Sequence, residues 1–201
     1  MKRGRTMKLK GTRYLALGAF LLVGLVCNPT KPEYAPGTLE ISFSFDQGAD
    51  KYKPTYASAI WLEDRGGNVT TLTLIDEWMA TTGYDGYCPA WSTKVKWTPP
   101  TDDAVDAVST ATPFPVAGTH TLTFDCRALK IEKGMYTFCM QTHIGKLDPD
   151  ESIDHYILRC GTITLGDQAR QSEASSVSYD PGEKSGFSTV LDNVKAQYSI
   201  E

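Results

Sequence analysis

The sequence predicts an all-β protein, an antiparallel immunoglobulin-like β-sandwich with a long inserted loop and an N-terminal signal or lipoprotein segment. Three observations indicate this class: short segments that alternate apolar and polar residues, turns rich in Gly and Pro between them, and little helical periodicity. Alternation with a period of two is typical of strands with one buried face. Strands at this spacing favour a sandwich.

The N-terminal 26 residues are typical of a signal peptide. Six basic residues (Lys2, Arg3, Arg5, Lys8, Lys10 and Arg13) precede an uncharged apolar run over 14–26. This arrangement indicates an export signal, and the run is too short to span a bilayer comfortably. The chain is therefore expected to be bacterial and extracytoplasmic, as a periplasmic or cell-surface lipoprotein.

Cys27 follows the apolar run directly, where bacterial lipoproteins carry their lipidated cysteine. Val26 before it is bulkier than the residue usual at that place. Cys27 is therefore either a lipidation site or the last residue of an uncleaved anchor. Either way the expected partner is a membrane, reached through a tether over 27–37.

The exported part is strongly acidic. Removing six of the 20 basic residues leaves 14 Lys and Arg against 24 Asp and Glu, a net charge of about −10. Such a surface repels phosphate backbones, so nucleic acid is excluded as a partner.

The strand pattern then runs along the chain in order. A sandwich domain is expected over 38–166, and the remainder, 167–201, is expected to be a C-terminal loop that can add edge strands. The segments with strand character are 38–46, 56–63, 69–75, 119–125, 135–143 and 153–165, followed by 174–179 and 189–200. Asp64–Asn68 contains the two glycines of a tight hairpin. A short helical period is visible only over 76–82.

Four cysteines of the exported part predict structural disulfides. If 144–152 is the loop of a hairpin, the antiparallel register places Cys139 opposite Cys160, at a distance that a disulfide accepts. Cys88 would then pair with Cys126. No CxxC spacing or histidine cluster indicates a metal site.

A long insertion over 76–115 interrupts the strand rhythm. It carries Trp78, Trp91 and Trp97 together with several prolines and acidic residues. These aromatic side chains either line a sugar or cofactor site or close one end of the sandwich.

Several stretches resemble DUF 2271, a family of predicted periplasmic proteins of unknown function. The resemblance lies in Ala59–Asp64, Gly67–Asn68–Val69, Thr71–Leu72, 105–113, 118–125 and the start of the hairpin at 134–137, and it spans roughly 38–166. It implies an immunoglobulin-type β domain encoded near flavin transferases and membrane redox proteins, which makes such proteins expected partners.

The segment 106–112 is also similar to the sequence that bacterial flavin transferases modify. That similarity would make Thr112 the acceptor of covalent FMN through a phosphoester bond, with Asp106 and Ser109 as recognition positions. Thr110 stands where such sequences usually carry Gly. The alternative is an ordinary loop leading into the next strand.

These observations predict an exported, membrane-tethered, non-catalytic accessory or binding protein, in which FMN is the one cofactor suggested. The alternatives are a flavinylated electron carrier and a module that binds a glycan or a protein. No catalytic motif such as GxSxG or HExxH occurs, so no enzyme activity is expected.

Overall fold

The computed structural model describes residues 31–45, 57–75, 88–95, 117–145, 154–182 and 190–200. The chain divides into two compact units, Met1–Lys31 and Pro32–Glu201, and the second unit contains all the strands named below. The signal segment and Cys27 lie outside the described residues. Within the described part of the chain, no helix is long and apolar enough to cross a membrane.

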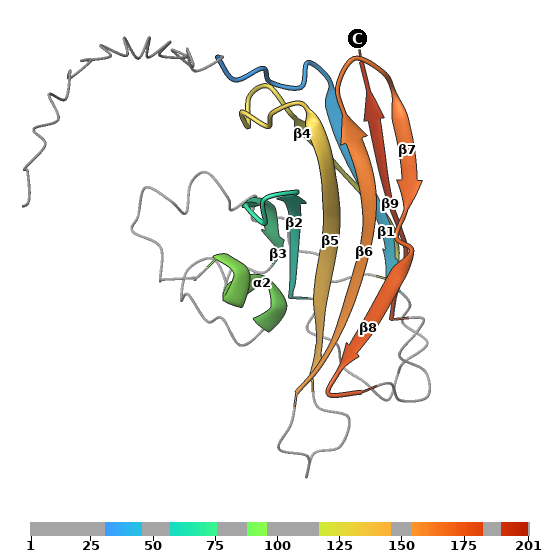
Figure 1. Cartoon of the computed structure of the whole chain (residues 1–201). Helices are drawn as coiled ribbons and strands as arrows, with labels where there is room; N and C mark the ends of the chain where they lie inside the picture. Colours follow the sequence, from blue (N-terminus) through green and yellow to red (C-terminus); the bar gives the residue numbers. More distant parts are fainter. Residues whose placement is uncertain are drawn as a thin grey trace, which may run out of the picture. The chain divides into compact units, whose positions relative to one another are not determined.

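Two antiparallel sheets pack together as a β-sandwich, as the alternating segments predicted (Figure 1). One sheet has the order β4-β1-β9-β7 and the other β3-β2-β5-β6-β8. The strands are β1 (Thr38–Phe45), β2 (Ser58–Asp64), β3 (Val69–Ile75), β4 (Gly118–Asp125), β5 (Gly134–Gly145), β6 (His155–Leu165), β7 (Arg170–Glu173), β8 (Ser176–Asp180) and β9 (Leu191–Ser199).

The first six strands follow an immunoglobulin-like order. β1 pairs with β4 in one sheet, while β2, β5 and β6 are neighbours in the other, with β3 beside β2. This corresponds to strands B and E facing C, F and G. Near the start of β5, the Tyr136 hydroxyl donates to the Glu132 carbonyl 2.8 Å away, which resembles the tyrosine corner of such domains.

The main core fills the space between the sheets. β1 is buried at every second residue, at Leu39, Ile41, Phe43 and Phe45, and β5 adds Phe138 and Met140. These side chains belong to one cluster with residues of β6 and β9. The polar alternate residues of β1 are more exposed, as the period of two predicts.

The Asp64–Asn68 turn forms the expected hairpin between β2 and β3. The Asp64 carboxylate accepts hydrogen bonds from the backbone N–H of Gly66 at 2.7 Å and of Asn68 at 2.9 Å. Hydrogen bonds from the Asn68 side chain and from the backbone lower the pKa of this carboxyl. Gly67 has φ of 80°, a conformation that glycine adopts without strain.

The C-terminal part contributes more than edge strands. β9 lies between β1 and β7, so the sandwich extends to Ser199 instead of ending at residue 166. β8 does lie at an edge, beside β6. β7 and β8 follow each other closely and pair with different sheets, so the chain crosses from one sheet to the other at residues 174–175.

A short helix covers the outer face of the larger sheet. This helix, α2 (Pro89–Val95), packs through Trp91 onto a second apolar cluster that includes Trp61 and Leu74. The Trp91 indole N–H donates to the Thr71 hydroxyl at 2.9 Å. Sequence periodicity did not reveal this helix, because seven residues are too few to display a helical repeat.

Candidate binding site

The predicted disulfide between Cys139 and Cys160 is confirmed. The two residues lie opposite each other in the β5–β6 register, with a Cα–Cα distance of 4.2 Å. The bond joins neighbouring strands on the outer face of the larger sheet, beside Trp61. Because structural disulfides persist in oxidising compartments, this bond is in keeping with an exported protein.

The predicted pairing of Cys88 with Cys126 is wrong. Both are buried and no disulfide joins them, because they belong to different clusters: Cys126 to the core between the sheets, and Cys88 to the cluster under α2. The five-stranded sheet separates these clusters. Cys88 Sγ instead lies 3.6 Å from the Gln141 carbonyl oxygen, toward which the thiol donates. Burial raises the pKa of Cys126 to about 11.

The proposed flavin segment cannot be placed in the fold. Asp106, Ser109 and Thr112 lie outside the described residues, as do Trp78 and Trp97. Trp91 is 1% exposed and covers the sheet instead of lining an open site. Among the described residues, no group of three His, Cys, Asp or Glu side chains could hold a metal ion.

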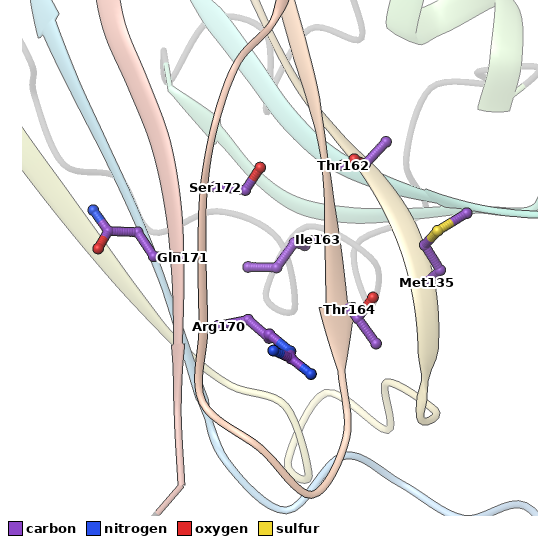
Figure 2. A pocket seen from close by; sticks show the side chains of 7 residues that line it. All are labelled: Met135, Thr162, Ile163, Thr164, Arg170, Gln171 and Ser172. Atoms are coloured by element: carbon purple, nitrogen blue, oxygen red, sulfur yellow. The ribbon is translucent and has the colours of Figure 1, made fainter.

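The structure reveals a different feature, a notch between β6 and β7. β8 pairs with β6 only over residues 156–160, and β7 pairs with β9 on its other side. Residues 161–165 of β6 therefore face 170–173 of β7 with no described strand between them. Figure 2 shows Ile163, Arg170 and Ser172 directed into the space between these two strands.

Backbone groups of β6 point into the notch. The Cys160 carbonyl accepts hydrogen bonds from Ser175 N–H at 2.9 Å and from the Ser176 hydroxyl at 3.1 Å, so it faces away from β5. In an antiparallel pair, alternate residues direct their N–H and C=O to the same side. The backbone groups of Thr162 and Thr164 therefore also face away from β5, toward β7.

The same reasoning applies to β7. Ala174 N–H donates to the Val194 carbonyl at 2.8 Å, so the backbone N–H and C=O groups of Ala174, and of every second residue before it, face β9. Gln171 and Glu173 then direct their backbone groups toward β6. Both walls of the notch thus present main-chain donors and acceptors.

Specific contacts close the two ends of the notch. At one end, Gly161 allows β7 to approach, since a Cβ on this residue would lie 2.6 Å from the Glu173 carbonyl oxygen. At the other end, the turn after β6 is fixed by Tyr198, whose hydroxyl donates to the Gly166 carbonyl at 2.9 Å and accepts Gly37 N–H at 3.0 Å. The notch is therefore preformed.

Lys133 anchors the same turn with charge. Its ammonium group lies 2.6 Å from Asp167 and 2.5 Å from Glu33. Hydrogen bonds to Asp167 and then to Glu33 raise the pKa of Lys133. Desolvation of the buried ring raises the pKa of Tyr198, so its hydroxyl stays protonated and remains a donor at neutral pH.

A cavity of about 170 Å³ lies in the notch. It is lined by Met135, Thr162, Ile163, Thr164, Arg170, Gln171 and Ser172 (Figure 2). Enclosed sites for small molecules are larger, roughly 300–1,000 Å³. The cavity is thus sized for one side chain or end group of a longer ligand. Arg170 is its charged residue, exposed and hydrogen-bonded to Gln168 Oε1 at 2.6 Å.

Comparisons with family models, with curated proteins and with solved structures give no match to this chain. The resemblance to DUF 2271 therefore stays a prediction.

Sequence patterns did not indicate the notch, for a physical reason. β7 has the sequence Arg-Gln-Ser-Glu, with no apolar residue to mark a buried face. In this chain the unpaired edge of β6 arises because β7 pairs with β9 in the other sheet, and no local sequence pattern shows that pairing.

Proposed function

We propose that this protein is exported, tethered to a membrane and non-catalytic, and that it serves as a β-sandwich binding protein. The observation that carries the binding role is the preformed notch between β6 and β7, with its cavity and Arg170. Proteins normally cover or shorten an open strand edge, because it invites pairing with another chain. An edge kept open and held from both ends supports a role in recognition.

Export and tethering rest on the N-terminal pattern and on Cys27, and they agree with the Cys139–Cys160 disulfide. The test is fractionation of cells that produce the full chain, compared with a Cys27→Ala variant. The wild-type protein is expected in the membrane fraction, with a lipid-sized addition to its intact mass. The Cys27→Ala variant is expected to lose that addition. If the N-terminal segment is an uncleaved anchor, the variant will still be found in the membrane fraction. A cytoplasmic protein with reduced Cys139 and Cys160 would overturn the proposal.

Covalent FMN is a second candidate, supported by the similarity of 106–112 to flavin-transferase substrates. The protein would then be an electron carrier whose flavin does the redox chemistry. Its partners would be a flavin transferase and a membrane redox protein. Peptide mapping after production with such a transferase should find an FMN-sized addition on the Thr112 peptide, absent in Thr112→Ala. Flavin that persists on the denatured variant would contradict this assignment.

A further inference from the structure

We infer that the notch binds an extended peptide that carries a carboxylate, by adding a strand to the free edge of β6. This inference rests on the proposed binding role and names the class of partner. The occupant would pair with Thr162 and Thr164 of β6, between the two closed ends of the notch, and its carboxylate would meet Arg170.

The first argument is main-chain complementarity. Thr162 and Thr164 offer N–H and C=O groups to the notch in the spacing of an antiparallel or parallel ladder, as shown by the direction of the Cys160 carbonyl. A peptide in extended conformation satisfies such groups without any particular sequence. Every second residue of a strand faces the same side, and an extended peptide has the same repeat.

The second argument is charge. Arg170 makes no ion pair with any carboxylate in the described part of the chain, and it donates instead to the neutral side chain of Gln168. Nearby cations differ, because Lys133 is paired with Asp167 and Lys195 with Glu173. A guanidinium at the rim of a cavity pairs well with a carboxylate, often through two parallel hydrogen bonds.

The third argument is the shape of the cavity. Its volume of about 170 Å³ suits a single side chain of the peptide, which would rest on buried Ile163 and beside Ser172. Alternate side chains of an added strand point to opposite faces, so one can enter the cavity while its neighbours stay outside.

A second copy of this chain is a less suitable occupant. The exported part carries a net charge of about −10, so two copies repel each other. The peptide is therefore expected from a different protein. Because both ends of the notch are closed, we expect the peptide to end there, with its C-terminal carboxylate at Arg170.

The test uses the full chain, purified in detergent, and three fluorescent hexapeptides of alternating Thr and Val. One ends in a free carboxylate, one in an amide, and one in an amide after a final Asp. Fluorescence anisotropy measures affinity. The peptide with the free carboxylate should bind at least about fivefold tighter than the neutral amide. A free-carboxylate peptide that binds no tighter than the neutral amide, or less tightly than the Asp peptide, would overturn the inference.

Two variants, each with a matched control, test the geometry. Arg170→Gln should weaken the free-carboxylate peptide about tenfold and leave the neutral amide within about twofold, whereas Arg127→Gln should change neither. Thr164→Pro removes an N–H that faces the notch and should weaken all three peptides about tenfold. Thr121→Pro is the control, because its N–H faces outward from the edge strand β4, as the Cys126–Gly37 hydrogen bond shows.

The inference fails if no peptide binds saturably at about 1 mM, or if Thr164→Pro and Thr121→Pro behave alike. A dimer of the full chain that Thr164→Pro abolishes, without peptide binding, would make a second copy the occupant and would also overturn it. Export and tethering are tested separately by fractionation. A tethered protein that binds no peptide loses only this inference, and a cytoplasmic protein that binds peptides loses only the proposed location.

Discussion

Both halves of β6 pair with β5, but among the described residues only the first half, 156–160, has a strand on its other side. The second half, residues 161–165, has the same neighbour on one side and no described strand on the other. The cause is the crossing of the chain at residues 174–175, where its pairing changes between β9 and β6. One strand is thus covered on both sides over its first half and, in the described part of the chain, paired on one side only over its second half.

The boundary between the two halves is Cys160, and its disulfide gives the largest predicted effect. Replacing Cys139 and Cys160 together by Ala should lower the free energy of unfolding by about 3 kcal/mol, because the bond closes a 21-residue separation. Denaturant unfolding measures the loss. Cys88→Ala is the control. Its loss of unfolding free energy should be smaller, and a reductant should destabilise it as much as it destabilises the wild type. Equal losses for both would mean that the disulfide does not stabilise β6.

Gly161 begins the open half, and a larger residue there should spread the closed end of the notch. In Gly161→Ala, the new Cβ would meet the Phe138 ring and the Glu173 carbonyl, so stability should fall by about 2 kcal/mol. Gly166→Ala is the matched control, since nothing lies within 4 Å of a Cβ at that position. If both variants unfold at the same denaturant concentration, β7 does not approach β6 at this end.

Tyr198 holds the other end of the notch, and its hydroxyl contributes less. Tyr198→Phe removes the hydrogen bonds to Gly37 and Gly166 and leaves a buried backbone N–H without its partner, at a cost of about 1.5 kcal/mol. Thermal unfolding checks this value. An unfolding midpoint of Tyr198→Phe equal to that of the wild type would contradict the anchoring role.

The smallest effect concerns Lys133 and depends on pH. The folded-state pKa of this lysine is raised, so its contribution is present below its ordinary value of 10.5 and is lost as the pH rises through the raised pKa. The unfolding midpoints of the wild type and Lys133→Met should therefore differ slightly at neutral pH and converge in strong alkali. A difference that grows with alkaline pH would have the wrong sign.

Local patterns in the sequence were enough to predict the β-sandwich and the Cys139–Cys160 pair. The register of the β5–β6 hairpin depends on one loop, so counting outward from that loop placed the two cysteines opposite each other. Cys88 and Cys126 could not be assigned in this way. Cys126 and Cys88 lie on opposite faces of the larger sheet, and the sequence pattern does not show which face each one contacts. No helical repeat in the sequence indicates that α2 covers the outer face.

The place of β9 shows the same limit. The strand character of 189–200 predicted a possible edge strand, but such a segment can lie at an edge or inside a sheet. Only its pairing with both β1 and β7 decides this, and the pairing with β1 joins residues far apart in sequence. The notch depends on these pairings, so it too follows from long-range contacts.

Amide hydrogen exchange in the full chain, resolved residue by residue without any ligand, tests the open edge most directly. Leu158 N–H faces β8, while Thr162 and Thr164 N–H face the notch. If the edge is open, the two threonine amides should exchange at least about 100-fold faster than that of Leu158. Equal protection of all three would mean that another part of the chain already covers this half of β6, and that the notch is not free to bind a peptide.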